Sequence, residues 1–256
     1  MCLFLGLFCN DQITVGGLIR GAKKVNFKYD IGIFNPVFES FQGNSTGKES
    51  SALLVGRGLI SFGDLESENY TISHKVNYFG KRKGLSFAIS GAMQGETDLF
   101  KRNYALGADF LLNFGSFNFD GEWSLLWRDG ISKNTQTSFT VATNTGYLGM
   151  TYNILLENGY VIEPAIMWMQ FNGETSTIGQ SNAALVNSLS GKDHNLDVGV
   201  NLYFNPDFKL SLHYTLRSAD AGAAGNGATV NNYFFEPEVG AIQRGDWLGL
   251  GLVTIF

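Results

Sequence analysis

Charged residues are scarce in this sequence. Lys, Arg, Asp and Glu make up 16% of its 256 residues, well below the roughly 25% that is typical of soluble domains. The net charge of -5 argues against a nucleic-acid partner, because phosphate backbones attract basic surfaces. No apolar run approaches the roughly 20 residues that span a bilayer as a helix. The composition therefore fits neither an ordinary soluble domain nor a helical membrane protein.

Cysteine and histidine are also rare. The chain has two cysteines, Cys2 and Cys9, and three histidines, His74, His194 and His213. So small a set argues against a Cys/His metal site, and nothing in the sequence calls for a cofactor. The two cysteines either stay free as small apolar residues or form a disulfide, and the sequence leaves both open.

The N-terminal segment MCLFLGLFC has no positively charged start and no small-residue cleavage site, which a signal peptide would have. It is a signal remnant, a first strand, or the start of a truncated chain. We favour a strand, with a truncated chain left open.

The most informative feature present is a period of two. In residues 103–128 every second residue is apolar, from Tyr104 to Trp127, and the residues between are mostly polar or small. This alternation is the signature of β-strands, and Gly115-Ser116 marks a tight turn between two of them. It recurs along the chain and predicts one all-β domain over residues 1–256, with no helix. We expect about twelve strands, near residues 2–8, 12–20, 24–34, 51–62, 84–93, 103–114, 117–128, 141–154, 160–171, 193–204, 207–217 and 245–256.

The connections between these strands differ in length in a regular way. From Gly84 onward, tight turns alternate with long polar loops, and the long connections as a whole cover residues 35–50, 129–138, 172–192 and 218–244. Outer-membrane barrels have short turns at one end and longer loops at the other. The pattern therefore predicts a closed antiparallel transmembrane β-barrel. Residues 63–83 depart from it, as a long insertion at the short-turn end that has room for an extra strand.

The two faces of the predicted sheet differ in chemistry. Aromatic residues near the strand ends predict girdles at the membrane interfaces, where amphipathic rings are favoured: Tyr104, Phe114, Phe117, Trp127, Phe204 and Phe208. Charges of both signs on the opposite face predict a water-filled lumen, lined by Lys28, Asp30, Arg57, Asp109, Asp120, Glu122, Arg128, Glu163, Asp197, Lys209, His213 and Arg217. The alternative is a soluble β-sandwich whose charged face is solvated.

The C-terminus supports a membrane location. Leu248, Leu250, Leu252 and Phe256 share one face of the last strand. A terminal phenylalanine resembles the signal read by bacterial barrel-assembly machinery, with Thr254 where a tyrosine is usual. We therefore expect an outer-membrane protein that contacts lipid and this machinery.

Four segments resemble the phosphate-selective porin O and P family of Gram-negative outer membranes. They are KVNFKYDIGIFNP, NYALGADFLLNFGSFNFDGEWSLLW, GYVIEPAIMW and DHNLDVGVNLYFNPDFKLSLHYTLR. The resemblance runs from about residue 12 onward. It implies a homotrimer of sixteen-stranded barrels with loops folded into the pore. On that basis this chain is either part of a sixteen-stranded porin or a shortened barrel.

The family also implies anion selectivity, which does not transfer directly. Met167 stands where the family commonly has a basic residue after Ile-Glu-Pro. The predicted lumen has six acids against five permanent bases and His213, whereas an anion channel needs a surplus of positive charge. We expect weak ion selectivity.

Three functions compete. The leading one is a porin for passive diffusion of small hydrophilic solutes or ions. A plugged structural or adhesive barrel is second, because bulky residues also face the lumen: Leu111, Leu126, Met167 and Tyr203. An outer-membrane lipid-modifying enzyme is least favoured, since Ser211 and His213 share a face but no acid is placed to orient the histidine. We therefore expect no enzymatic activity.

Overall fold

The computed structural model describes residues 2–8, 12–35, 51–71, 75–131, 137–225, 233–236, 238–243 and 245–254. The strands are β1 (Cys2–Phe8), β2 (Gln12–Arg20), β3 (Val25–Phe34), β4 (Leu53–Gly63), β5 (Lys83–Gln94), β6 (Arg102–Phe114), β7 (Phe117–Ile131), β8 (Ser138–Tyr152), β9 (Ile154–Leu155), β10 (Val161–Asn172), β11 (Lys192–Asn205), β12 (Phe208–Asp220), β13 (Tyr233–Glu236), β14 (Gly240–Gln243) and β15 (Trp247–Thr254). The helical elements are a short 3-10 turn, η1 (Ala22–Lys24), and one α-helix, α1 (Thr177–Leu185).

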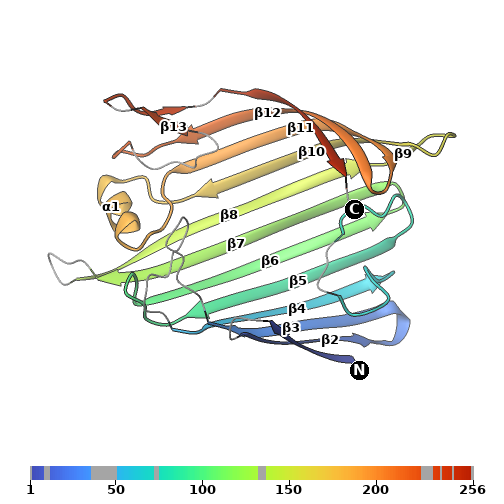
Figure 1. The fold of residues 1–256 in the computed structure, drawn as a ribbon, viewed down its shortest axis with the longest axis horizontal. Coiled ribbons are helices and arrows are strands. Elements are labelled where there is room, and N and C mark those ends of the chain that lie inside the picture. The colour runs from blue at the N-terminus through green and yellow to red at the C-terminus, as the bar shows by residue number, and fades with distance from the viewer. Residues whose placement is uncertain are drawn as a thin grey trace.

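Among the described residues, twelve strands lie side by side in one antiparallel sheet, in the order β1-β2-β3-β4-β5-β6-β7-β8-β10-β11-β12-β15 (Figure 1). Each corresponds to one predicted strand. The two-residue β9 pairs with β10, and β13 pairs with β14 as a separate hairpin. The expectation of an antiparallel all-β fold with about twelve strands is confirmed.

The sheet is open in this structure. Between the described residues, β1 pairs with β2 and β15 with β12, and no ladder joins β1 to β15. Closure into a barrel therefore remains a prediction. None of the described helices is long and apolar enough to cross a membrane.

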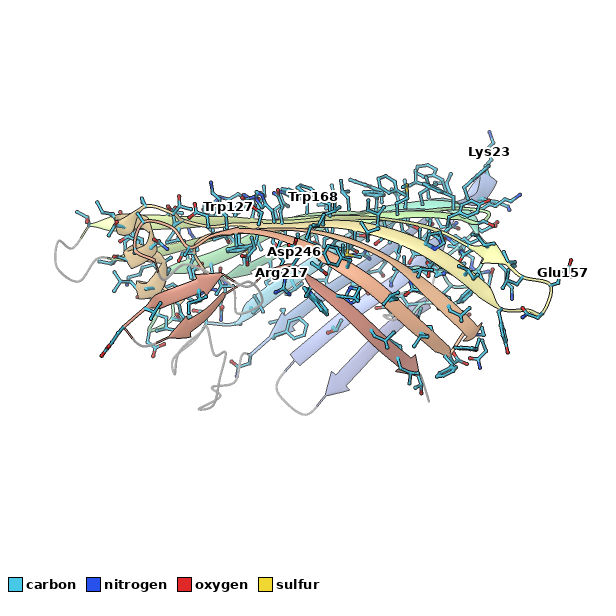
Figure 2. All side chains as sticks on the ribbon, turned by 90° about the horizontal axis from the view of Figure 1, so that it is seen from above. Lys23, Trp127, Glu157, Trp168, Arg217 and Asp246 are labelled. Carbon is cyan, nitrogen blue, oxygen red and sulfur yellow. The ribbon has the colours of Figure 1, made fainter. Side chains whose placement is uncertain are left out.

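The sheet is strongly curved, so it has a convex and a concave face (Figure 2). Trp127 and Trp168 lie on the convex side, and Arg217 and Asp246 lie beneath the arch on the concave side. Directly paired residues on neighbouring strands share a face. Tyr104, for example, pairs with Trp127 and therefore lies on the convex face. Following the pairing from strand to strand assigns every residue of the sheet to one face.

Burial on the two faces is the reverse of that in a soluble protein. Apolar side chains of the convex face are widely exposed, as for Ile89 at 54% and Leu250 at 74%. Many polar side chains of the concave face are buried, as for Asn118 at 0% and Glu163 at 3%. Soluble domains bury apolar groups and leave polar groups in water. The sheet therefore presents a continuous apolar surface outward and keeps its polar groups inside.

Tight turns join the strands at one end. Gly115 has a φ of 61° in the turn between β6 and β7, and Gly159 has a φ of 85° in the turn before β10. Glycine adopts these left-handed conformations without the steric cost that a Cβ atom brings. The predicted turn at Gly115-Ser116 is confirmed, and it sets the direct pairing of Phe114 with Phe117.

The prediction of no helix was wrong for α1, which forms within the long connection at residues 172–192. The hydroxyl oxygen of Ser176 accepts a hydrogen bond from the Gly179 amide at 3.0 Å and caps the helix N-terminus. Ala183 and Val186 pack with Phe100 and Val141 in a small apolar cluster. A nine-residue helix is marginal alone and gains most of its stability from such packing, so its local sequence carries only a weak signal.

The extra strand suggested within residues 63–83 is not found in the described part of that segment. Residues 75–78 have no strand structure, and residues 72–74, including His74, lie outside the described residues. The segment instead crosses the concave face, as the contacts below show.

Candidate functional site

The concave face carries all twelve residues that were predicted to line a lumen. The alternation along β3, β4, β6, β7, β10, β11 and β12 and their register place them together on this side. The six predicted girdle residues occupy the convex face, with Tyr104 stacked on Trp127 at 5.2 Å and Phe204 against Phe208 at 5.0 Å between ring centroids. Phe256 and Cys9 lie outside the described residues. Whether the concave face conducts solute stays a prediction.

A cavity of about 520 Å³ lies over β2 to β8 on the concave face. Its best-ordered feature is a bidentate ion pair, in which the Arg57 guanidinium donates to both carboxylate oxygens of Asp109 at 2.7 and 3.0 Å. The Lys28 ammonium lies 4.0 Å from the Asp30 carboxylate and donates to the Thr71 carbonyl. Both bases of this cavity are therefore held by acceptors beside them.

A second cavity, of about 660 Å³, lies over β7 to β12. Asp120, Glu122 and Tyr147 line both cavities, so the two are contiguous and meet at this group. The second cavity also contains Glu163 and Lys209. Together the cavities form a path with charged side chains along the inside of the arch.

The described residues 64–71 and 75–82, which we call the inner segment, lie against the concave face. The Asn77 amide nitrogen donates to Asn153 Oδ1 at 2.9 Å and to Glu163 Oε1 at 3.0 Å, and Asn153 donates back to Asn77 Oδ1 at 2.9 Å. The Phe79 ring packs edge-on against Tyr203 with 4.9 Å between centroids. These contacts tie the inner segment to β10, β11 and the end of β8, across the sheet from β4, where it begins.

Arg82 fixes the end of the inner segment. Its side chain is 2% exposed and donates to Asn113 Oδ1 at 2.6 Å, to Ser86 Oγ at 2.8 Å and to the Asp64 carbonyl at 3.0 Å. Burial lowers the pKa of this guanidinium from its ordinary value. Burial also raises the pKa of Tyr78 to about 12. The segment is therefore packed into the concave face and is not a solvated loop.

A ladder of asparagines at the turn end of the strands completes this network, and sequence reasoning missed it. Asn113 donates to the Val76 carbonyl at 3.0 Å and to Asn118 Oδ1 at 2.7 Å, and Asn118 donates to Thr151 Oγ1 at 3.0 Å. Asn201 donates to Glu163 Oε2 at 3.1 Å. The signal that could have revealed the ladder is asparagine recurring at lumen-facing positions near the turns, since an amide can both donate and accept.

The loop that contains α1 lies on the concave face at the opposite end. Arg128 donates to the carbonyls of Val186 and Asn187, both at 2.9 Å, and lies 4.7 Å over the Phe100 ring. The buried Gln180 donates to the Ala221 carbonyl at 2.7 Å and accepts from the Ala224 amide at 2.7 Å. Gln180 therefore joins the α1 loop to the start of the next long loop, at the end of the sheet opposite the tight turns.

His213 has an acid beside it, contrary to the sequence-based expectation. Its Nδ1 lies 2.9 Å from Asp197 Oδ2 on the neighbouring strand β11, where Asp197 is diagonal to His213 and pairs directly with Thr215. The Ser211 hydroxyl, however, donates to Asn201 Oδ1 at 2.6 Å and has no hydrogen bond with the histidine. The geometry lacks the nucleophile-to-base contact of a hydrolytic triad.

Nearby, both carboxylate oxygens of the 4% exposed Asp193, and Arg217 Nε, have no hydrogen-bond partner among the described residues. No group of three or more His, Cys, Asp or Glu residues within the described ranges is placed to hold a metal ion.

No family model, curated protein or solved structure matches this chain. The resemblance to the phosphate-selective porins therefore stays a prediction. The polar concave face, crossed by the inner segment and backed by an apolar convex face, is the feature on which a function can be argued.

Proposed function

We propose that this protein is an outer-membrane porin that gives small hydrophilic solutes or ions a passive route along its concave face. The observation that carries the proposal is the reversed burial of the sheet. A convex face of exposed aliphatic and aromatic side chains suits lipid, and a concave face of buried polar groups suits water.

Strand length agrees with this role. β6 has 13 residues, which extend about 43 Å and rise about 33 Å at a tilt of 40°. The apolar band of outer-membrane barrels is about 25 Å tall, so such strands are long enough to cross it. Twelve strands would enclose a narrower lumen than sixteen, because barrel diameter grows with strand number.

The same proposal includes the Gram-negative outer membrane as location, membrane lipid and barrel-assembly machinery as partners, and a homotrimer as the assembled state. These follow from the resemblance to phosphate-selective porins and from the sequence of the last strand. The open sheet agrees with closure of its two edges on each other or with pairing of those edges to further strands of a sixteen-stranded barrel.

Tryptophan fluorescence tests which face meets lipid. Three of the four tryptophans, Trp123, Trp127 and Trp168, lie on the convex face, whereas Trp247 contacts His213 and Arg217 on the concave face. In vesicles of brominated phosphatidylcholine, the tryptophan fluorescence of the Trp247→Phe variant should be strongly quenched, because its three remaining tryptophans lie on the convex face. A variant that keeps Trp247 alone should be quenched weakly. Equal, weak quenching in both would contradict a lipid-facing convex surface.

Conduction is tested separately with the folded chain in planar lipid bilayers and in liposome-swelling assays with small sugars. A porin gives stepwise conductance and swelling. Folded, inserted protein that gives neither would refute the porin proposal.

A second candidate is a plugged structural or adhesive barrel. The specific observation in its favour is the inner segment, whose Asn77 and Arg82 side chains bind the walls of the concave face. If the barrel is plugged, planar-bilayer recordings show no conductance steps, while the fluorescence quenching is the same as for a porin. We propose no enzymatic activity, because Ser211 bonds to Asn201 and leaves His213 without a nucleophile beside it.

A further inference from the structure

The charges that line the two concave cavities are unevenly distributed. Of the residues that the structure describes, nine charged ones line one or both cavities: Lys28, Asp30, Arg57, Glu66, Asp109, Asp120, Glu122, Glu163 and Lys209. Six are acids and three are bases, so the formal charge of the lining is -3. We propose that the path through these cavities selects for monovalent cations and small organic cations, and excludes phosphate and other anions. This inference rests on the proposed porin function and specifies its substrate class.

Acids and bases are nearly balanced over the whole predicted lumen, but they are not balanced within the two cavities. Two of the predicted lumen bases lie outside both cavities. Arg128 is held at the loop end by two carbonyls of the α1 loop and the Phe100 ring. Arg217 lies 5.5 Å from the Trp247 ring centroid near the sheet edge formed by β12 and β15. Neither residue lines either cavity. Two of the five predicted bases thus lie away from the cavities, whereas five of the six predicted acids line them together with Glu66.

Two of the three bases that line the cavities are largely neutralised. Arg57 is fully engaged with Asp109 at 2.7 Å, and Lys28 is held by Asp30 and by the Thr71 carbonyl. Paired charges of opposite sign largely cancel at the distance of a passing ion. These two pairs therefore contribute little net field to the path.

Two carboxylates in the path are stabilised by neutral groups alone. Glu163 accepts from the amides of Asn77 at 3.0 Å and Asn201 at 3.1 Å, and Glu122 accepts from the Ser124 hydroxyl at 3.3 Å. Neither forms an ion pair with a lysine or arginine among the described residues. Neutral donors carry no charge that would cancel the charge of a carboxylate. The negative field of these groups is therefore available to a cation in the cavity.

Glu122 has the largest expected effect, since it is exposed and lines both cavities. A carboxylate about 7 Å from a monovalent ion in water changes the local ion concentration about threefold. With a net lining charge of -3, we expect a potassium-to-chloride permeability ratio of about three to ten at low salt. Removing one of these charges should lower that ratio two- to threefold, a rough estimate from the same Coulomb term.

Reversal potentials measure the preference directly. The wild-type chain and the variants Glu122→Gln and Glu163→Gln would be compared in a KCl gradient near 0.1 M, where the Debye length is about 10 Å. Glu157→Gln is the matched control, because Glu157 lies at the tip of an exposed turn away from the arch (Figure 2). The expected result is a cation-selective potential that falls in both cavity variants and is unchanged in the control. Conducting wild-type protein with no potential, or with an anion-selective one, would overturn the proposal.

A second measurement does not depend on conduction. Ser90 lines the first cavity, and the variant Ser90→Cys, made in a Cys2→Ser and Cys9→Ser background, places a thiol there. Cationic and anionic methanethiosulfonate reagents of similar size would be compared, with rates normalised to a free thiol. We expect the cationic reagent to react several times faster, and Glu122→Gln to reduce the ratio. Equal rates would overturn the cation preference even in a plugged barrel, whereas unequal rates without conductance would refute only the porin function.

Discussion

Removing the Asn77 side chain should loosen the inner segment from the concave face. The Asn77→Ala variant loses two hydrogen bonds with Asn153, one with the Glu163 carboxylate and one that Asn77 Oδ1 accepts from the Phe79 amide. A neutral hydrogen bond contributes a net ~1 kcal/mol and one to a charged group ~1.5–3 kcal/mol. The gross loss is therefore about 4.5–6 kcal/mol, summed from those typical values for three neutral bonds and one to a charged group.

Part of this loss is recovered, because the cavity beside Asn77 is about 660 Å³ and water can reach the freed groups. We take about 2.7 kcal/mol as the remaining cost, which corresponds to a factor of about 100 in the equilibrium between docked and released segment. The change is local, because the strand ladders that hold the sheet are untouched. The fold itself should remain.

Hydrogen exchange measured by mass spectrometry on the folded protein reports this equilibrium. Protection of peptides from residues 75–82 should fall by up to about 100-fold in Asn77→Ala, with peptides from β6 and β7 unchanged. Single-channel conductance should rise at the same time. The control is Asn69→Ala, which removes an exposed amide from the same segment without breaking a side-chain hydrogen bond found in the structure. Equal protection in the two variants would refute the docking of the segment through Asn77.

Three further predictions test other parts of the structure. Arg128→Met should destabilise the α1 loop by about 2 kcal/mol, because two carbonyls lose a charged donor; exchange of residues 177–187 measures this, and the exposed Arg102→Met is its control. Tyr78 donates from its hydroxyl to the Glu66 carbonyl at 3.1 Å and has a pKa raised to about 12 from an ordinary value of 10.0, so its contribution to the stability of the inner segment is full below pH 10 and is lost as the pH rises toward 12. Exchange at alkaline pH should show this loss in wild type but not in Tyr78→Phe. Leu106→Arg, on the convex face, should impair membrane insertion by about 2–4 kcal/mol, whereas Leu126→Arg on the concave face should be tolerated. Equal insertion of the two arginine variants into lipid vesicles would contradict the assignment of faces.

The strands and their faces could be predicted from the sequence because alternation is a local property. A period of two, as from Tyr104 to Trp127, identifies both the strand and the side on which each residue lies. Antiparallel neighbours joined by short turns, such as Gly115-Ser116, then bring most strands together in sequence order. The positions of all twelve predicted lining residues on one face follow from these rules alone.

Contacts between distant segments could not be predicted in this way. The bond from Asn77 to Glu163 joins residues 86 positions apart, and that from Arg128 to Asn187 joins residues 59 apart. Such contacts depend on where a long connection lies after the sheet has curved, and no local pattern encodes that path. The same reason explains why α1 was missed. The acid beside His213 lies on the neighbouring strand β11, and finding it required the register of β11 on β12.

The sequence alone therefore determined an antiparallel sheet with one apolar and one polar face, since the spacing of residues along each strand decides both. Only the tertiary structure decided how the polar face is filled. The inner segment is laid across it, the bases Arg128 and Arg217 are held away from the two cavities, and carboxylates such as Glu122 line them. That arrangement changes a nearly balanced charge count into a negative path, because a passing ion responds to the charges within a few ångströms and not to the sum over the chain.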